Sequence, residues 1–147
     1  MGSRHIAGVG GSVSSFTVDL LTGLSAYLAA HSITTPVFFK VLPTSPDRCI
    51  AITAYSSVDE PKIALSHVRV QFWFRSVVND SLDVDDLADS VFALLQGAEN
   101  VTFGTAHMVQ ALRVSSIQLG IDSNKRAERS DNYEFDLDVP TTSGRPW

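Results

Sequence analysis

The chain has 147 residues, a mass of 15.9 kDa and a formal net charge of −5 at pH 7. Apolar residues make up 44% of it and charged residues 18%, which is typical of one globular domain with a hydrophobic core. The negative charge argues against a protein whose main task is to grip nucleic acid, because phosphate neutralisation needs a basic face. It is compatible with a surface along which nucleic acid slides without binding.

Cys49 is the only cysteine, which excludes an internal disulfide and fits a reducing compartment. It lies in the apolar run CIAITAY, so we expect a buried, inert thiol rather than a nucleophile. The N-terminal MGSRHIAGVGGS lacks the apolar segment of a signal peptide. No apolar run approaches the ~20 residues needed to cross a bilayer. We therefore expect a soluble protein, made in a cytoplasm, without membrane contact.

Composition divides the chain into a Gly- and Ser-rich N-terminal arm (1–13), one domain (14–140) and a short tail (141–147). We expect the arm and the tail to be mobile, or ordered only by a partner. From about Ser15, apolar residues recur at spacings of three and four, which predicts a helix that ends before Pro36. Its expected buried stripe is Phe16, Leu20, Leu21, Leu24, Tyr27 and Leu28.

Two β-rich runs follow, VFFKVL (37–42) and CIAITAY (49–55), and the linker PTSPDR between them predicts a turn. We therefore expect these runs to form a hairpin. The strongest strand signal is SHVRVQFWFRSVVND (66–80), which alternates with a period of two. One face carries Val68, Val70, Phe72 and Phe74, and the other carries His67, Arg69, Gln71, Trp73 and Arg75.

The segment DVDDLADSVFALLQG, from Asp83, predicts a second helix. Its expected buried stripe is Val84, Leu87, Ala88, Val91, Leu94 and Leu95. Asp83, Asp85 and Asp86 crowd the first turn and look like a metal cluster. The helix dipole favours negative charge at this end, so it explains the three aspartates without a metal.

The C-terminal part begins with NVTFG and a β-like run from His107 to Leu119 whose facing is ambiguous. We expect the polar segment GIDSNKRAERSD (120–131) to be a loop. The last strand, NYEFDLDVP, places Tyr133, Phe135, Leu137 and Val139 inward and Glu134, Asp136 and Asp138 outward. The order of elements predicts a single α+β domain, whose mixed, mostly antiparallel sheet has two helices packed on one face. The other face then remains open.

That open face is the candidate interface, and its charged and aromatic side chains come from two strands: Arg69, Trp73 and Arg75 on one, and Glu134, Asp136 and Asp138 on the other. If the strands are neighbours, opposite charges pair across them at about 0.2–1 kcal/mol per pair, which would give a solvated, self-neutralised face. Trp73 fits such a face poorly, and tryptophan and arginine are enriched at protein–protein contacts. We therefore predict that a partner covers this face.

The basic residues Lys125, Arg126 and Arg129 of the expected loop are further candidates for contact with an acidic partner; solvated loop charges are the alternative. The sequence contains no complete motif for phosphate or metal binding. GVGGS has no following lysine for a phosphate loop, and DSNKRAE has Arg126 at the third calcium-ligand position. The histidines are outside zinc-ligand spacing. We expect no catalytic residue, metal or cofactor, and a pocket built from His67, His107 and Asp122 is the alternative.

Five segments follow one another between residues 66 and 140: VRVQFWFRSVVND, the Asp-rich DLAD helix, ENVTFG, VQALR and RSDNYEFDLDVP. Their succession resembles the tail terminator proteins of long-tailed bacteriophages, also called minor capsid or minor tail proteins, especially in phages of actinobacteria. The resemblance implies a compact α/β structural protein without catalytic residues, which assembles as a six-fold ring.

The resemblance also implies what the ring does. It would cap the finished tail tube, stop its polymerisation and dock the head–tail connector or stopper protein, while DNA passes through the channel without specific binding. The protein would be found in the virion tail or neck, after assembly in the host cytoplasm. The alternatives are a head-completion or stopper protein of the neck, a tail tube subunit, and, more remotely, a small cytoplasmic enzyme or ligand-binding domain.

Overall fold

The structure is a computed structural model that describes residues 16–55, 59–60, 65–104 and 106–138. The predicted N-terminal arm and C-terminal tail lie outside the described residues. The elements of the described part are, in chain order, α1 (Phe16–Ala30), β1 (Val37–Phe39), β2 (Cys49–Tyr55), β3 (Asp59–Glu60), β4 (Leu65–Val78), α2 (Asp83–Gln96), β5 (Glu99–Phe103), β6 (Ala106–Ile121) and β7 (Arg126–Asp138).

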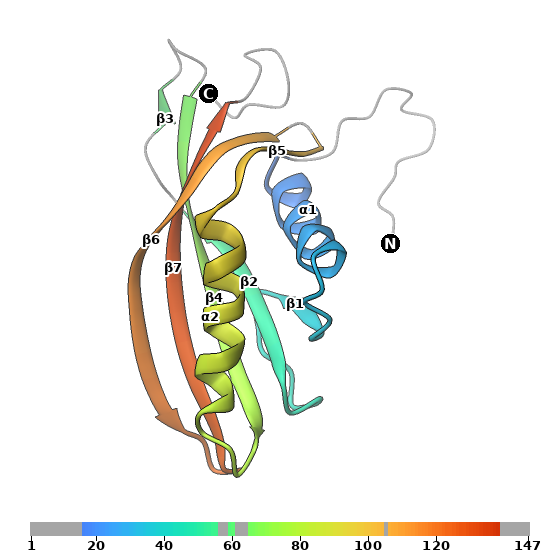
Figure 1. Cartoon of the computed structure of the whole chain (residues 1–147), viewed down its shortest axis with the longest axis vertical. Coiled ribbons are helices and arrows are strands. Elements are labelled where there is room, and N and C mark those ends of the chain that lie inside the picture. The colour runs from blue at the N-terminus through green and yellow to red at the C-terminus, as the bar shows by residue number, and fades with distance from the viewer. Residues whose placement is uncertain (1–15, 56–58, 61–64, 105, 139–147) are drawn as a thin grey trace.

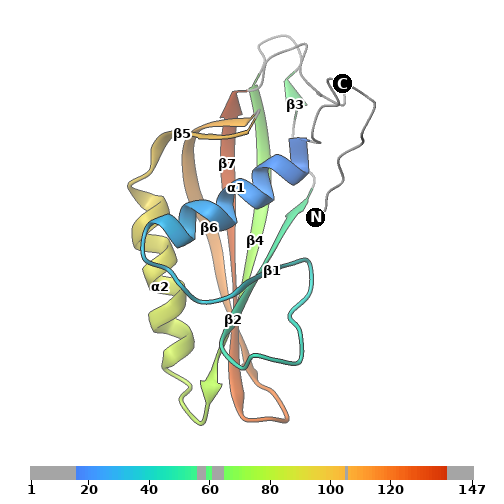
Figure 2. The ribbon, with the colours of Figure 1, turned by 90° about the vertical axis from the view of Figure 1, so that its right-hand side faces the viewer.

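The strands form one sheet in the order β1-β2-β4-β7-β6-β5, with the short β3 paired to β4. β1 runs parallel to β2, and the other pairs are antiparallel. The sheet curls, and α1 and α2 cover the same side of it (Figure 1). Turned by 90°, α1 crosses in front of the strands and α2 lies along one side of them (Figure 2). The predicted α+β domain with both helices on one face of a mostly antiparallel sheet is confirmed.

The core lies between the helices and the sheet. The alternate residues Val68, Val70, Phe72 and Phe74 of β4 are buried there, as are Tyr133, Phe135 and Leu137 of β7. The rings of Phe72 and Tyr133 meet edge to face, with their centroids 5.2 Å apart. Burial of one such side chain contributes about 1.5–3 kcal/mol. The predicted facing of both strands is confirmed, except at Val139, which lies outside the described residues.

The apolar stripes of the two helices complete this core. Leu20, Leu21, Leu24 and Leu28 of α1 are buried, and Phe16 and Tyr27 are partly buried against them. In α2 the buried residues are Val84, Leu87, Ala88, Val91 and Leu95, with Leu94 partly buried. Both predicted helices and their stripes are confirmed.

The predicted hairpin between residues 37–42 and 49–55 is wrong. β1 and β2 pair in parallel, with Val37 beside Ile50 and Phe39 beside Ile52. The chain leaves β1 at Lys40, which has a positive φ of 76°, and the segment 40–48 returns to the start of β2 instead of reversing direction in a tight turn. Side chains from strands that are distant in the sequence hold this returning segment in place. The turn prediction uses neighbouring residues only, so it could not include these contacts.

The expected loop at 120–131 is also wrong. β6 continues to Ile121 and β7 begins at Arg126, so a short turn joins the two strands. In this turn Asp122 accepts hydrogen bonds on Oδ1 from the backbone N–H groups of Asn124 and Arg126, both at 2.9 Å. Such an aspartate turn satisfies the backbone locally. Arg126 and Arg129, which follow this turn, lie in β7 and pair with carboxylates of the protein itself.

Candidate interaction surface

A series of cross-strand polar pairs occupies the open face of the sheet. β4 and β7 place Arg69 opposite Glu134 and His67 opposite Asp136. Arg69 Nε donates to Glu134 Oε1 at 3.1 Å, and His67 Nδ1 lies 2.6 Å from Asp136 Oδ1. The predicted pairing of basic and acidic residues across neighbouring strands is confirmed for Arg69 and Glu134. Asp138 lies at the exposed end of β7.

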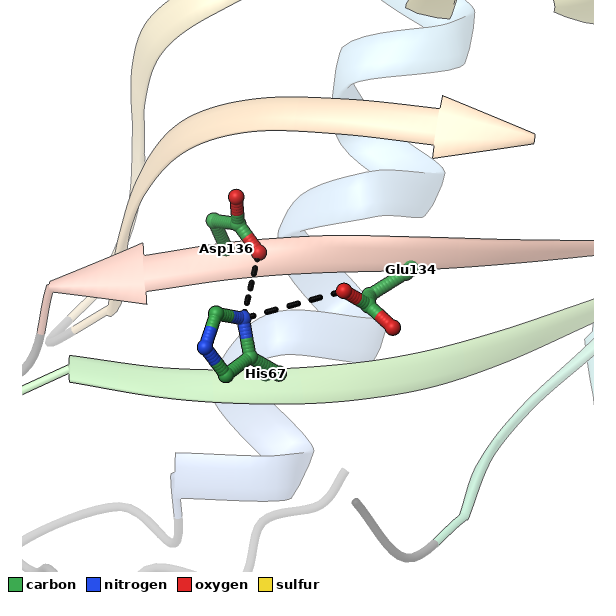
Figure 3. A group of neighbouring side chains, drawn as sticks. All are labelled: His67, Glu134 and Asp136. Carbon is green, nitrogen blue, oxygen red and sulfur yellow. Dashed lines mark hydrogen bonds and ion pairs between the residues drawn. The ribbon is translucent and has the colours of Figure 1, made fainter. Parts of the chain in front are cut away.

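His67, Glu134 and Asp136 form a group whose ligand atoms lie within 4.8 Å of one another, as a metal site would require (Figure 3). Their polar atoms already have protein partners. Asp136 Oδ2 accepts from Gln110 Nε2 at 2.8 Å, and Glu134 binds Arg69. A cation here would lie beside the like-charged Arg69 guanidinium, which opposes its binding. The arrangement therefore works as a charge network that joins β4, β7 and β6.

Trp73 lies on the open face, as predicted, but it is only partly exposed. Its indole N–H donates to Glu128 Oε1 at 3.0 Å. Beside it, Gln71 Nε2 donates to Ser130 Oγ at 2.9 Å, and the Tyr55 hydroxyl donates to Asn132 Oδ1 at the same distance. This face therefore combines aromatic surface with polar groups that are already satisfied, which is a composition suited to a protein contact.

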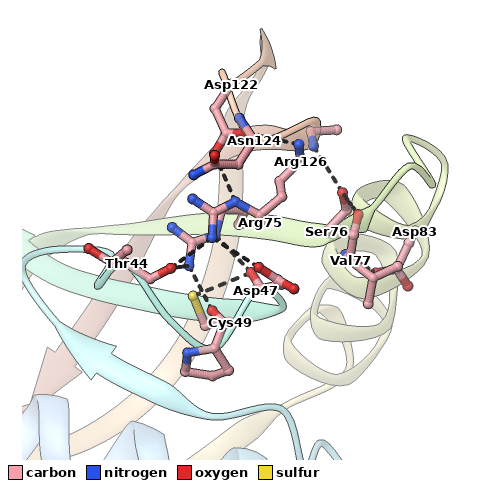
Figure 4. A network of polar contacts seen from close by, with 12 residues as sticks. Thr44, Asp47, Cys49, Arg75, Ser76, Val77, Asp83, Asp122, Asn124 and Arg126 are labelled. Carbon is pink, nitrogen blue, oxygen red and sulfur yellow. Dashed lines mark hydrogen bonds and ion pairs between the residues drawn. The ribbon is translucent and has the colours of Figure 1, made fainter.

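Arg75 was expected to meet water on this face, and that expectation is wrong, because the residue is only 3% exposed. The segment 40–48 folds over the end of β4. Arg75 donates to the carbonyl oxygens of Asp47 and Pro46, each at 2.7 Å (Figure 4). The backbone of this segment thus replaces water around the guanidinium group.

Arg126 also holds this segment. It donates to the carbonyl oxygen of Thr44 at 2.8 Å and pairs with Asp122 at 2.9 Å and with Asp47 at 3.2 Å (Figure 4). Burial opposes the charge, yet these carboxylates raise the pKa of Arg126 above its ordinary value. The pKa of Asp122 is lowered, chiefly by the backbone N–H of Arg126. Arg126 is therefore a structural clamp rather than the solvated loop charge considered from the sequence.

Arg129 lies on the helix-covered face, where it joins β7 to α2. Its guanidinium group pairs with Asp85 and Asp131, each at 2.9 Å, and with Asp89 at 3.3 Å. Asp131 is 0% exposed and Arg129 is 6% exposed. The prediction that Arg129 is a loop residue exposed to a partner is therefore wrong. Lys125, in the turn, is exposed.

The aspartates at the start of α2 also have specific partners. The Nε–H group of Arg48 is shared between the two carboxylate oxygens of Asp83, at 3.0 and 3.1 Å, and the backbone N–H of Val77 donates to Asp83 at 3.0 Å. Asp85 accepts from Gln118 Nε2 at 2.7 Å. The sequence explained these carboxylates by the helix dipole alone, and it missed their role in tying α2 to the sheet.

The profile of the family described as bacteriophage tail terminator protein matches residues 19–139, which extend from α1 through β7. The chain belongs to the bacteriophage tail terminator proteins. No curated protein matches it. Membership makes it a structural component of the virion tail and confirms the resemblance seen in residues 66–140. In the described part of this tail terminator, no helix is long and apolar enough to cross a membrane.

The tail terminator also has an exposed apolar row that sequence reasoning missed. It lies along β6 and consists of Val109, Leu112, Val114, Ile117, Leu119 and Ile121. The run was recognised as β-like, but its facing was ambiguous. Three irregularities in the pairing of β6 with β7 interrupt the alternation of inward and outward residues. The signal present in the sequence was the large number of apolar residues in this run. A strand with one regular alternation could not bury all of them.

Proposed function

We propose that this tail terminator assembles as a ring of six copies that caps the tail tube, ends its polymerisation and joins it to the head–tail connector. The observation that carries the proposal is the family match, which includes all of the described strands, α2 and most of α1. A ring needs a contact between two different patches, repeated around an axis. The partners are further copies of the chain, the tail tube protein and the connector or stopper protein.

The open face supports a role in assembly. Arg69, Trp73, Glu134 and Asp136 present charged and aromatic surface there, and Asp138 extends it at the end of β7. We propose that a neighbouring copy or another tail component covers this face in the virion. The net charge of −5 also supports a channel that DNA crosses without specific binding, because like charges do not adhere. Assembly takes place in the host cytoplasm under this proposal.

A role as a tube subunit is less well supported. Stacking of tube subunits calls for a long hairpin that is free to reach a neighbour. The long hairpin of this domain, β6 with β7, is built into the sheet, because β7 pairs with β4 from Arg126 to Asp138. The described residues therefore offer no free arm of this kind.

The enzyme alternative depended on a pocket made by His67, His107 and Asp122. Asp122 follows the C-terminal end of β6, whereas His107 is near the beginning of that strand. His67 lies at the same end of the sheet as His107, since these residues pair with Asp136 and Asp138. The three side chains therefore do not converge on a common pocket.

Tail length in particles made without the protein tests the proposed function. Electron microscopy should show overlong tails of variable length that are not joined to heads, and supplying the protein should restore uniform, head-bearing tails. Tails of normal length without heads would instead support the stopper role. Normal virions in its absence would contradict a role in the tail altogether.

A further inference from the structure

Two turns lie against each other at one end of the long axis of the domain. One joins β4 to α2 (79–82) and the other joins β6 to β7 (122–125), and both are at the lower end in Figure 1. The backbone N–H of Asn79 donates to the carbonyl oxygen of Lys125 at 2.9 Å. Both residues have a left-handed backbone, with φ of 63° and 64°. The hydrogen bond joins the two turns into one surface at the end of the sheet.

A surface cavity of about 300 Å³ lies where the two turns meet. It is lined by Asn79, Asp80, Ser81, Ile121 and Lys125. Sites for small molecules have volumes of about 300–1,000 Å³ and mostly apolar walls. This cavity is at the lower limit of that range, and Ile121 is its one apolar residue. It is therefore better suited to one or two side chains of a protein partner than to a cofactor.

Exposed aliphatic side chains adjoin the cavity. Ile121, which lines it, is 64% exposed, and Leu82, which follows Ser81, is 72% exposed. Val78, which precedes Asn79, is 41% exposed. Single exposed apolar residues are ordinary on a protein surface, whereas a group of them beside a cavity is typical of a contact site. This end of the domain therefore offers apolar surface next to polar groups.

Lys125 gives the cavity a positive charge that the subunit does not neutralise. Among the lysines and arginines that the structure describes, only Lys40 and Lys125 have side chains without a hydrogen bond or ion pair. Glycine and asparagine adopt the left-handed backbone of this turn more readily than lysine does. The backbone therefore gives no reason for a lysine at position 125, whereas a carboxylate of a partner does.

The groups around the cavity define the chemistry of its occupant. The ammonium group of Lys125 attracts a carboxylate, and Ile121 and Leu82 offer packing for an aliphatic side chain. Asp80, from the other turn, repels a second carboxylate and can accept a hydrogen bond from a backbone N–H group. A protein loop that carries one acidic residue beside an aliphatic residue supplies all of these groups.

We propose that this cavity binds such a loop of another virion protein, with the acidic side chain at Lys125 and the aliphatic side chain against Ile121. The cavity lies at an end of the long axis, whereas the open face runs along the sheet (Figure 1). A second protein can therefore occupy the cavity while the open face is covered. The inference rests on the proposed function, because that function supplies the neighbouring virion proteins.

Two charge reversals test the site. Binding is titrated against two immobilised probes, tail tubes assembled without this protein and purified head connectors. Lys125→Glu replaces attraction by repulsion and should weaken binding to one of the probes by about ten-fold or more. Lys40→Glu is the matched control, because Lys40 is also exposed and unpaired, with φ of 76°, but does not line the cavity. It should bind both probes as the wild type does.

Two further variants separate binding from folding. Lys125→Gly removes the charge and suits the left-handed backbone, so its thermal unfolding midpoint should be at least that of the wild type while its binding weakens. Ile121→Ser removes an exposed aliphatic side chain, so it should fold normally and also bind the same probe more weakly. All of these variants should keep the oligomeric mass of the wild type in light scattering.

The outcomes separate this site from the proposed function. If Lys125→Glu and Ile121→Ser bind both probes as strongly as the wild type, the site is overturned and the function stands. If Lys125→Glu instead dissociates into monomers, the occupant is another copy of the chain, which also overturns the proposal. A wild-type protein that binds neither tail tubes nor head connectors contradicts the proposed function and this inference with it.

Discussion

Trp73 and Glu128 are joined across β4 and β7 by a hydrogen bond of 3.0 Å from the indole nitrogen to a carboxylate oxygen. The bond fixes a large aromatic side chain on the face of the sheet opposite α1 and α2. Because its N–H group is satisfied within the subunit, the ring can be covered by a partner without leaving a donor unpaired. Under the proposed function, a partner can therefore bury the pair without breaking this bond.

Trp73→Ala should weaken assembly while the subunit still folds. The indole is partly exposed, so its loss should lower the free energy of unfolding by about 1–2 kcal/mol, less than the loss of a core aromatic residue. Urea denaturation measures this cost, and light scattering measures assembly. Trp73→Phe, which keeps an aromatic ring but loses the bond to Glu128, is the control and should assemble better. If Trp73→Ala is unfolded, Trp73 belongs to the core and the open face is wrongly assigned.

Arg129→Met should destabilise the subunit strongly. It leaves the carboxylate of Asp131, which is 0% exposed, buried without its closest cationic partner. Removal of one member of a buried ion pair costs about 3–5 kcal/mol. Arg69→Met is the matched control, because it breaks the half-exposed pair with Glu134 and should cost less than about 1 kcal/mol. Equal losses of unfolding free energy for the two variants in urea denaturation would contradict the different roles assigned to the two arginines.

The stability of the subunit should decrease in acid, in part through Asp85. The amide of Gln118 and the guanidinium of Arg129 lower the pKa of Asp85 below its ordinary 3.8. A carboxyl whose pKa is lower in the folded state stabilises the fold above its ordinary pKa, and this contribution disappears as the pH falls through the folded value. The stability gap between the wild type and Asp85→Asn should therefore narrow below pH 3.8 in urea titrations. A gap that is constant with pH would contradict the linkage.

Gly23→Ala should destabilise the subunit although alanine is the better helix former. A Cβ atom at Gly23 would lie 2.5 Å from Cβ of Phe103, where α1 packs on β5. Such overpacking typically costs 1–3 kcal/mol. Gly97→Ala is the control, because nothing lies within 4 Å of its added Cβ and its φ is −93°. The free energy of unfolding of that variant, measured by thermal or urea denaturation, should rise by about 0.4–1 kcal/mol. Stabilisation by Gly23→Ala would show that α1 does not approach β5 so closely.

Strict local patterns made much of the fold predictable. The alternation from Val68 to Phe74 identified β4 and its inward face, and the apolar spacing identified both helices. The family was recognisable from the succession of segments, although no single motif carries chemistry. These features depend on residues close together in the sequence, so the sequence reveals them directly.

Other features depend on residues far apart in the chain. Arg75 and Arg126 hold the segment that makes β1 parallel to β2, and Arg129 finds its partners on α2. A charged residue in a polar segment therefore appears solvated in the sequence, because the sequence does not show which distant residue pairs with it. The exposed row on β6 escaped notice because its bulges change the period, so no constant alternation describes the strand.

The mass and symmetry of the purified protein test the account most directly. Native mass spectrometry gives the number of copies, and electron microscopy gives the symmetry of the particle. We expect a closed six-membered ring with a central channel. A protein that stays monomeric at every concentration, or that grows into open fibres, would contradict it.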